Sequence, residues 1–420
     1  MDIRYGYLCN CVASASFAQS SITPRENTMQ RRNFIRLTTG GVIAAATLST
    51  AGLSGCAPGM PPEAIEAWRG PSPDLATTDV RRWLLSYAIL APHSHNLQSW
   101  IVDLSTPNEI LLRCDLKRLL PQTDPLSRQI MMSHGTFLEL LDLAAKERGL
   151  RADITLFPEG AFGPEQLDTR PVARIRLTPD TAVQKDPLFT QVLLRHTNRS
   201  AYDLSRSVPT TAWQAMSDAA KSPTLRFGQV GTEQPELLAK HRQIAAEAWR
   251  IELTTPRTIM ESFDVLRVGA KEIAQHRDGL SLLDAKVVWL NRLGLFDRSK
   301  APAPDDFATT SQIKSFGANL DVTPGFLWMV TDGNDRVTQI NAGRAYARVQ
   351  LAATAQGLVM QPLSQALQEY PEQKQPYADI HALTGAARPG QTVQMWARVG
   401  YAPAASPAPR RQLQDFIARS

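Results

Sequence analysis

The sequence predicts an α+β fold, and the order of its hydrophobic patterns is the reason. An amphipathic helical pattern over 80–90 is followed by two alternating, strand-like runs, 99–105 and 109–116, separated by a Thr-Pro-Asn turn. A strongly periodic helix over 128–148 ends at Gly149, and alternation then returns. This order of helix, hairpin, helix and further strands defines the α+β class.

The rest of the chain continues the mixed pattern. Strands are expected at 152–157, 172–177, 225–230, 326–331, 358–363 and 393–399. Helices are expected at 188–193, 210–221, 233–253 and 341–356. The stretch 256–316 is helical in pattern with a proline-rich break at 301–304, and we interpret it as an insertion that forms a lid over a site.

Composition indicates a soluble globular protein large enough for one large or two ordinary domains. The chain has 420 residues, of which 43% are hydrophobic and 20% charged. The formal charge is +5, but residues 1–55 carry five arginines and two acids, so the basic balance gives no support for nucleic-acid binding. Of the four cysteines, Cys9, Cys11, Cys56 and Cys114, only the last lies well inside the globular part, so no disulfide framework is expected.

The N-terminal region has the pattern of an export signal. Arg31-Arg32-Asn33-Phe34-Ile35-Arg36 precedes an uncharged run over 37–55, and this resembles a twin-arginine signal. The run ends in Leu53-Ser54-Gly55-Cys56, which resembles a lipobox whose cleavage leaves Cys56 as a lipidated N-terminus. An ordinary secretory signal and a membrane anchor are alternatives, although the run is short and weakly apolar for a stable span. We expect export by the twin-arginine machinery and a lipid-anchored protein on the periplasmic side.

Four segments follow from these boundaries. The signal region is 1–55, within which Met29 lies where such a signal normally begins, so translation is expected to start there. Prolines and glycines make 56–73 a tether. The folded part is expected near Asp74, as two units that divide at 186/187, the second carrying the insertion over 256–316.

A cluster of polar side chains between the first helix and the first strand is the leading candidate for a binding site. The turn reads Ala91-Pro92-His93-Ser94-His95-Asn96-Leu97-Gln98-Ser99-Trp100. Pro92 stops the helix, and the polar side chains of the turn supply donors and acceptors on a loop held between two rigid elements. Such a loop can line a polar, planar ligand. A turn whose amides only satisfy its own backbone is the competing interpretation.

A second candidate is the stretch Arg195-His196-Thr197-Asn198-Arg199 at a helix-to-loop junction. It places two guanidinium groups and a hydroxyl within five residues. Arginine matches phosphate with a bidentate fork, and the threonine hydroxyl adds a donor. A solvated basic helix end is the alternative.

The polar turn resembles the Ala-Pro-Ser-x-His-Asn-x-Gln-Pro-Trp loop of nitroreductase-fold flavoproteins, in particular the Acg-type branch of FMN-binding oxidoreductases. In that fold the loop lies against the isoalloxazine ring, which implies flavin contacts from Pro92, His93, Ser94, Asn96 and Gln98. His93 and Ser99 depart from the Ser and Pro of the family pattern. The stretch 195–199 resembles the family's Arg-x-Ser/Thr-x-Arg element, which implies that Arg195, Thr197, Asn198 and Arg199 hold the FMN phosphate.

Two further segments gain a role from the same resemblance. Gly357-Leu358-Val359-Met360-Gln361-Pro362-Leu363-Ser364-Gln365 is similar to the segment beside flavin N5. It implies cofactor contacts from Gln361 and Pro362 and an N5 environment formed by Leu363, Ser364 and Gln365. Arg410 and Arg411 resemble the family's C-terminal Ser-Pro-Arg-Arg phosphate clamp; a disordered basic tail is the competing interpretation, because 402–409 is of low complexity. Arg128 is a weaker candidate for the flavin pyrimidine edge, against a surface arginine at a helix start.

The resemblance also implies fold and function. Ordinary nitroreductases are homodimers with FMN at the subunit interface, and the Acg-type branch folds two such units in one chain. We therefore expect a nitroreductase-like fold of two tandem related halves that form an internal pseudo-dimer around one FMN, so that no second chain is required. The expected activity is electron transfer through flavin N5, with NAD(P)H as a candidate donor and a small electron-poor molecule, a nitroaromatic or a quinone, as acceptor. An FMN-binding or sequestering protein without reductase turnover is the alternative, and a lipid-tethered scaffold is a third.

Other chemistries find no support in the sequence. His93 and His95 have no third ligand at metal-binding spacing, so no metal is expected. There is no phosphate-binding glycine fingerprint between a strand and a helix, and no Gly-x-Ser-x-Gly nucleophile motif. Cys114 lies in a predicted strand and is expected to be a small buried hydrophobe. Membrane contact is expected only through the lipid anchor.

Overall fold

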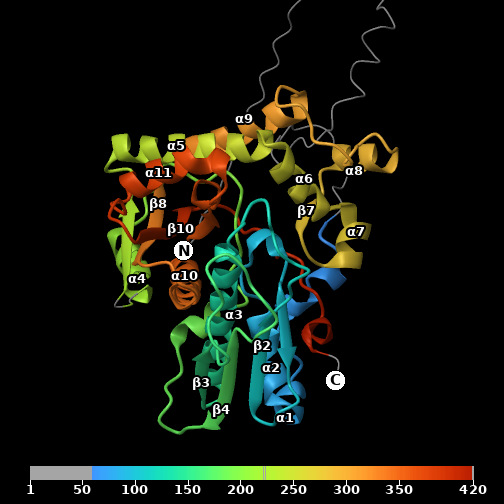
Figure 1. Ribbon diagram of the computed structural model, residues 1–420, viewed down its shortest axis with the longest axis vertical. Coiled ribbons are helices and arrows are strands. Elements are labelled where there is room, and N and C mark those ends of the chain that lie inside the picture. Colours follow the sequence, from blue (N-terminus) through green and yellow to red (C-terminus); the bar gives the residue numbers. More distant parts are fainter. Residues whose placement is uncertain (1–58, 221, 223, 419–420) are drawn as a thin grey trace, which may run out of the picture. The chain divides into compact units, whose positions relative to one another are not determined.

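Two four-stranded antiparallel sheets with the same strand order organise the chain (Figure 1). The computed structural model describes residues 59–418 except 221 and 223. The first sheet contains β1 (Trp100–Asp103), β2 (Glu109–Cys114), β3 (Leu150–Leu156) and β4 (Ala173–Pro179), in the order β1-β2-β4-β3. The second contains β5 (Leu225–Val230), β8 (Gly325–Asp332), β9 (Val359–Pro362) and β10 (Gln391–Gly400), in the order β5-β8-β10-β9.

The helices repeat in the same way as the strands. A helix precedes each sheet's first strand, α2 (Val80–Ala88) before β1 and α4 (Thr210–Ala219) before β5. A long helix follows each sheet's second strand, α3 (Arg128–Glu147) after β2 and α10 (Arg336–Ala355) after β8. The chain thus contains two units of the same topology. The expected α+β class and the tandem related halves are confirmed.

Helices α3 and α10 form the joint between the halves, and glycines allow them to touch. Gly135 and Gly343 lie at the same distance from the start of their helices. A Cβ atom at Gly135 would lie 2.0 Å from the carbonyl oxygen of Ile340, and one at Gly343 would lie 1.9 Å from that of Met132. The main chains of the two helices are therefore in direct contact, which only glycine permits at these two positions.

Buried charges lock the same joint. Arg128 and Arg336 each begin one of the two helices, and each donates to a main-chain carbonyl of the opposite half: Arg128 Nη1 to Gln394 (3.2 Å) and Arg336 Nη1 to Leu126 (2.8 Å). Glu139 of α3 in turn binds two arginines of α10, Arg344 at 2.8 Å and Arg348 at 2.9 Å. The joint is held by a repeated pattern, as expected for related halves.

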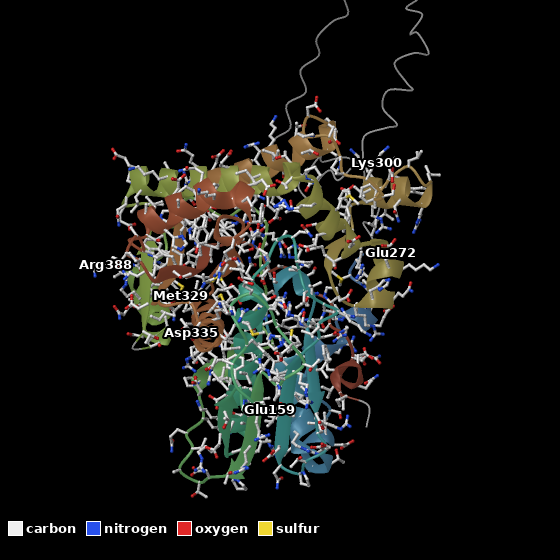
Figure 2. The ribbon with its side chains drawn as sticks, viewed as in Figure 1. Glu159, Glu272, Lys300, Met329, Asp335 and Arg388 are labelled. Atoms are coloured by element: carbon white, nitrogen blue, oxygen red, sulfur yellow. The ribbon has the colours of Figure 1, made fainter. Side chains whose placement is uncertain are left out.

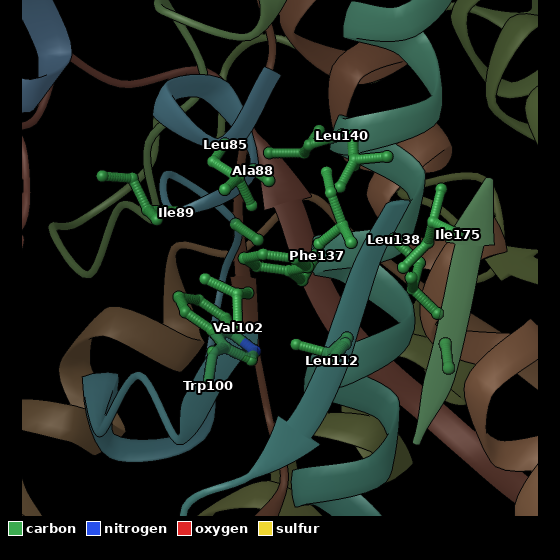
Figure 3. Packing of buried hydrophobic residues seen from close by; sticks show 14 of the residues in the cluster. Leu85, Ala88, Ile89, Trp100, Val102, Leu112, Phe137, Leu138, Leu140 and Ile175 are labelled. Atoms are coloured by element: carbon green, nitrogen blue, oxygen red, sulfur yellow. The ribbon is translucent and has the colours of Figure 1, made fainter. Parts of the chain in front are cut away.

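The core of the first half fixes the polar turn at both ends. Figure 3 shows Leu85 and Ala88 from α2 and Trp100 and Val102 from β1 near Phe137 of α3, with Ile89 just after the end of α2. The ring centroids of Trp100 and Phe137 lie 5.0 Å apart, and both residues are completely buried. The residues immediately before and after the turn are packed in the core, so both ends of the turn are held in place.

A large insertion separates β5 from β8. It contains α5 (Pro235–Thr254), α6 (Pro256–Asp264), β6 (Leu266–Val268), α7 (Gly269–His276), β7 (Leu280–Leu282), α8 (Ala285–Arg292) and α9 (Phe307–Asp321). Strands β6 and β7 pair in parallel, and apolar side chains from α6, α8 and both strands form a core of their own. The sequence analysis expected the insertion over 256–316; in the structure everything between β5 and β8 is inserted. Its role as a lid stays a prediction.

Several elements differ from the sequence expectation. Helix α10 begins at Arg336 instead of 341, because Asp335 caps it through the Thr338 N–H (2.8 Å) and its first turn is polar. Strands β6 and β7 are too short for alternation to reveal them. Helix α11 (Lys374–Leu383) had no place in the predicted order.

Part of the expected tether is folded. Residues 62–64 and 66–69 form two short 3-10 helices, and Trp68, which belongs to the second, is 8% exposed. Its indole Nε1 donates to the Ala408 carbonyl at 2.8 Å. Burial of this large apolar ring stabilises the segment despite its prolines, so ordered structure begins well before Asp74. The signal region, the twin arginines, Met29, Cys9, Cys11 and Cys56 lie outside the described residues. Within the described ranges, no helix is long and apolar enough to cross a bilayer.

Candidate functional site

The polar turn between α2 and β1 has a strained backbone. His95, Asn96 and Gln98 have φ values of 47°, 54° and 55°, in the left-handed region that residues other than glycine avoid. Such a conformation costs roughly 1–2 kcal/mol per residue, least for asparagine. A chain that holds three such residues within four positions must stabilise them by contacts elsewhere, and strain of this kind gathers at binding sites.

The C-terminal segment supplies much of that stabilisation. The Asn96 amide donates to the Pro409 carbonyl (3.1 Å), and its oxygen accepts from Arg410 Nη1 (2.9 Å). Gln98 is fully buried; it donates to the Arg277 carbonyl (2.9 Å) and accepts from the Arg411 N–H (3.0 Å). The amides of Asn96 and Gln98 are thus engaged within the protein, where they set the path of the turn.

His93 and Ser94 complete the internal support. The His93 Nδ1 is 2.8 Å from the Ser94 carbonyl and therefore carries the proton, while Nε2 accepts from the Ser99 N–H at 3.1 Å. Burial holds the pKa of His93 well below its ordinary value, so the ring is neutral. The Ser94 N–H donates to the Ser133 hydroxyl (3.2 Å), and the Pro92 carbonyl accepts from the Thr136 hydroxyl (2.8 Å). Helix α3 thereby fixes the start of the turn.

Two buried arginines fasten the end of α2 beneath the turn. Arg410 is 4% exposed and donates to the carbonyls of Ile89 (2.8 Å), Leu90 (2.9 Å) and Ala91 (3.1 Å). Arg195 is 2% exposed, and its Nη2 donates to the same Leu90 carbonyl at 2.8 Å. These carbonyls are the free acceptors of a helix C-terminus, where positive charge is favoured.

Trp68 lies between these two arginines. Its ring centroid is 5.0 Å from the guanidinium carbon of Arg410 and 5.5 Å from that of Arg195. His196 meets the same ring edge-on at 4.6 Å. The indole face attracts both cations, so Trp68 offsets part of the repulsion between them.

Three of the arginines near the turn have no acidic partner. Among the described residues, Arg195, Arg199 and Arg410 make no salt bridge. Burial lowers the pKa of Arg195 to about 10, and it lowers the pKa of Arg199 and Arg410 as well. Tyrosines and another arginine are the charged or titratable groups that act on these three, and no carboxylate is among them. Buried charges are normally paired, so this region is suited to an anion from outside the chain.

Within the stretch 195–199, two side chains make hydrogen bonds inside the protein and two do not. Arg195 is taken up by Leu90 and by Gln350, whose Oε1 lies 3.1 Å away. The Asn198 amide donates to the Pro403 carbonyl at 2.8 Å. The Arg199 guanidinium is exposed to solvent and has no hydrogen-bond or ion-pair partner among the described residues, and the same holds for the Thr197 hydroxyl. Arg199 is accessible, and burial by the surrounding protein lowers its pKa.

The turn and the arginine stretch meet at His95. Its imidazole is partly accessible and has no hydrogen-bond partner among residues 59–418 that are described. Burial and the nearby Arg199 guanidinium lower the pKa of His95 to about 4. The electrostatic effect of Arg199 on His95 indicates that the turn of the first half and the stretch 195–199 of the second lie near each other.

The segment 357–365 adjoins this region. The Asn198 N–H donates to the Met360 carbonyl (3.0 Å), and the Gln361 Oε1 accepts from Arg398 Nε (2.7 Å). Pro362 ends β9, and the Leu363 side chain, 2% exposed, points into the core of the second half. Ser364 and Gln365 remain partly accessible. Their expected place beside a flavin stays a prediction.

Arg128 and Cys114 are structural. Arg128 is completely buried and pairs with Glu369 and with main-chain carbonyls, so neither a flavin contact nor a surface position describes it. Cys114 is 4% exposed, and burial raises its pKa, as expected for a small buried hydrophobe. In the described part of the chain, no group of three metal-ligating side chains is found.

The C-terminal arginines are ordered, so the interpretation of a disordered basic tail is wrong. Arg411 is 8% exposed, its Nη2 donates to the Gln98 carbonyl (3.2 Å), and its guanidinium lies 4.2 Å from the Phe416 ring centre. The side chains of Arg410 and Arg411 hold the turn. Whether they also reach a phosphate stays a prediction.

Sequence reasoning missed three residues of this region. His95 was considered only as a metal ligand and left out of the expected flavin contacts, although it occupies the histidine position of the family's loop pattern. Trp68 was assigned to the tether on the strength of the prolines around it. Arg398, completely buried in β10, donates to the Ser200 carbonyl (2.8 Å) as well as to Gln361. The available signal was an arginine between the apolar residues Ala397 and Val399.

Comparison with known proteins finds two curated relatives that match most of the chain. No protein-family model matches the chain. Two curated proteins of Mycobacterium tuberculosis, both named "Putative NAD(P)H nitroreductase" and belonging to strains H37Rv and CDC 1551, are each 26% identical over 363 residues. The match covers 82% of this chain and 92% of each relative. The chain is therefore nitroreductase-like over most of its length, as the two motifs predict.

Solved structures of nitroreductases also align with the chain. A crystal structure of a "putative nitroreductase" from Anabaena variabilis covers 80% of this chain and 91% of its own, with 10% identity and a TM-score of 0.44. The FMN-dependent nitroreductase NfnB of Mycobacterium smegmatis, in complex with NADPH, covers 55% of this chain and 96% of its own, with 19% identity and a TM-score of 0.32.

Proposed function

We propose that this protein is an FMN-dependent oxidoreductase of the Acg-type nitroreductase branch, which takes electrons from NAD(P)H and passes them to an electron-poor acceptor such as a nitroaromatic or a quinone. The relatives named as NAD(P)H nitroreductases support the reaction class. The observation that carries the cofactor assignment is the accessible Arg199, which has no ion-pair partner among the described residues and on which no carboxylate acts.

The residues present fit a flavin phosphate. A phosphate monoester needs several donors and a positive field, and Arg199 and Thr197 have free donors while Arg195 and Arg410 add charge from beneath. Arg411, Pro92, Ser94 and the segment 361–365 are the further proposed contacts. When bound, FMN would supply two-electron transfer between a nicotinamide and the acceptor. The chain's own part is to orient it: Asn96, Gln98 and His93 fix the turn, and Arg398 fixes Gln361.

We also propose that the protein is exported by the twin-arginine route and anchored by a lipid on Cys56. The signal-like pattern over 31–56 supports this, and a route that carries folded proteins suits a cofactor bound before export. Mass spectrometry of the membrane fraction would detect a diacylglycerol-modified Cys56 peptide. A precursor that keeps residues 1–55 in the native host would contradict the proposal.

One experiment tests the cofactor and the reaction together. The purified protein should show a flavin absorbance band, and NADPH added under argon should bleach it. A band that persists after NADPH would instead support the alternative, an FMN-binding protein without turnover. A colourless protein that binds no added FMN would refute the proposal.

Replacement of Arg199 tests the phosphate contact. Arg199→Ala should weaken FMN binding by about 1.5–3 kcal/mol, the value of a hydrogen bond to a charged group, or roughly 10- to 100-fold. The midpoint of unfolding should stay unchanged, because this guanidinium makes no hydrogen bond or ion pair with another described residue. Affinities are measured by the quenching of flavin fluorescence.

Arg388→Ala is the matched control for that variant. Arg388 is also exposed and unpaired, but it lies at the surface away from the turn (Figure 2). Its replacement should leave FMN affinity unchanged. Equal affinities for Arg199→Ala and the unaltered protein would remove Arg199 from the site.

A further inference from the structure

We infer that the insertion makes a second contact with the membrane, through an apolar patch of Trp289, Leu293 and Leu295 that enters the headgroup region of a phospholipid bilayer. The inference goes beyond the proposed electron transfer and draws on the proposed lipid anchor at Cys56. It extends the sequence expectation, in which the anchor alone reaches the membrane.

Helix α8 is apolar on two faces. Val287 and Val288 are 0% and 7% exposed in the core of the insertion, whereas Trp289 is 62% and Leu293 64% exposed. The Leu293 N–H donates to the Trp289 carbonyl at 3.1 Å, so these two side chains lie one turn apart on one face. Leu295, in the turn after the helix, is also exposed. Single exposed apolar residues are common, but three within 289–295 form a patch of the kind that marks an interaction surface.

The side chains around the patch suit a lipid surface. The guanidinium carbon of Arg292 lies 5.7 Å from the Trp289 ring centre. Arg292 and Lys286 are exposed, and neither makes an ion pair with a described residue. Tryptophan, arginine and lysine combine an apolar body with a polar end, and they gather where hydrocarbon meets headgroups. Helix α8 has 8 residues, too few to cross a bilayer, so the contact is with the surface, and the two cations favour anionic lipids.

The start of the folded chain connects the patch to the proposed anchor. The first 3-10 helix, Pro62–Ala64, packs against α7. On α7, Glu272 pairs with Arg298 (3.1 Å) and accepts from the Asn291 amide of α8 (3.3 Å). Cys56 is six positions before the 3-10 helix, and even a fully extended segment of that length spans only roughly 20 Å. A lipid on Cys56 therefore holds this side of the insertion close to the bilayer.

Vesicle binding without the anchor tests the patch. The full chain carrying Cys56→Ser has no thiol to lipidate, and its affinity for vesicles of phosphatidylcholine and phosphatidylglycerol is measured by co-sedimentation. The double replacement Trp289→Gln and Leu293→Gln in this background should bind roughly tenfold or more weakly, because two apolar side chains no longer leave water. Residues 1–55 are the same in every protein compared, so their own affinity for lipid cancels in the ratio.

Val337→Gln is the matched control. It removes another exposed apolar side chain, in the first turn of α10, and should leave vesicle affinity unchanged. Figure 2 shows Asp335, two residues before it, well away from Glu272 and Lys300 of the insertion. All the replaced side chains are exposed, so the midpoints of thermal unfolding should agree. Hydroxyl-radical footprinting adds a readout by position: vesicles should protect Trp289 and Leu293 from oxidation and leave Val337 reactive.

Three results would overturn the inference. They are equal vesicle affinities with and without the double replacement, unchanged oxidation of Trp289 in the vesicle-bound protein, and a stable dimer that the double replacement dissociates, since a second copy would then cover the patch. The proposed function fails in other ways. An unmodified Cys56 in the native host would refute the anchor, and a protein that binds no FMN would refute the flavin assignment, but neither alters these vesicle measurements.

Discussion

At the scale of single residues, arginines near the polar turn have opposite roles. Arg410 donates hydrogen bonds to the carbonyls of Ile89, Leu90 and Ala91, and so replaces the hydrogen bonds that α2 lacks at its end. The Arg199 guanidinium donates no hydrogen bond to a described residue. A buried, fully engaged guanidinium stabilises the fold, whereas an accessible, unpaired one is available to a ligand.

Arg410→Ala should therefore destabilise the protein. The replacement leaves the Ile89 and Ala91 carbonyls and the Asn96 amide oxygen without their charged partner, while Leu90 keeps Arg195. The expected loss in the free energy of unfolding is about 3 kcal/mol or more. Urea denaturation followed by circular dichroism measures it. Arg410→Lys, which keeps the charge but not the fork, should recover only part of the loss. Unfolding of Arg410→Ala at the same urea concentration as the unaltered protein would contradict this role.

At the scale of elements, the crossing of α3 and α10 decides whether the halves dock. The site takes the turn 91–98 from the first half and 195–199, 357–365 and 409–411 from the second. A shift of one long helix against the other therefore moves the two sides of the site apart. The crossing tolerates no side chain at Gly135 or Gly343.

Gly135→Ala and Gly343→Ala should each destabilise the protein by about 3 kcal/mol or more, because the new methyl group meets a main-chain oxygen that cannot turn away. Thermal unfolding measures the loss. Gly317→Ala is the control: this glycine lies inside α9 with open space around it, so alanine should stabilise the helix by up to about 1 kcal/mol. If all three variants unfold at the same temperature, the close crossing is refuted.

At the scale of the whole molecule, buried histidines make the fold sensitive to acid. His134 and His241 are completely buried, and burial lowers the pKa of each to about 4 from the ordinary 6.5. The unfolded chain therefore binds these protons at a higher pH than the folded one. Stability is lost as pH falls from about 6.5 to 4, by roughly 3 kcal/mol for each of the two. Two carboxyls act in the opposite direction, since burial raises the pKa of Glu252 to about 7 and that of Asp124 to about 6.

His241→Leu tests this account. The His241 ring stacks against Phe326 and Trp328, and neither nitrogen has a hydrogen-bond partner among the described residues. The variant therefore loses little packing and no hydrogen bond, and it should lose less stability than the unaltered protein between pH 6.5 and 4. Urea midpoints at several pH values provide the comparison. Parallel pH curves would show that His241 does not contribute.

The comparison between sequence and structure follows the same scales. Strands and helices with regular apolar spacing, such as α3 and β5, were predicted within a few residues, because their periodicity is local. Elements whose order depends on distant contacts were not. Trp68 folds a stretch that its prolines mark as a tether, and the lone arginine of β10 gave no hint that it would fasten Gln361.

The sequence by itself determined the α+β class and the two motifs that resemble a flavin site, because each depends on residues close together in the chain. Only the tertiary structure decided which polar groups of those motifs make hydrogen bonds within the protein and which have no such partner among the described residues. That division depends on partners as distant as Arg410 from Ile89 and Gln98 from Arg277. A hydrogen bond satisfied inside the fold removes a residue from the candidates for binding, and no local pattern records where such a partner will come from.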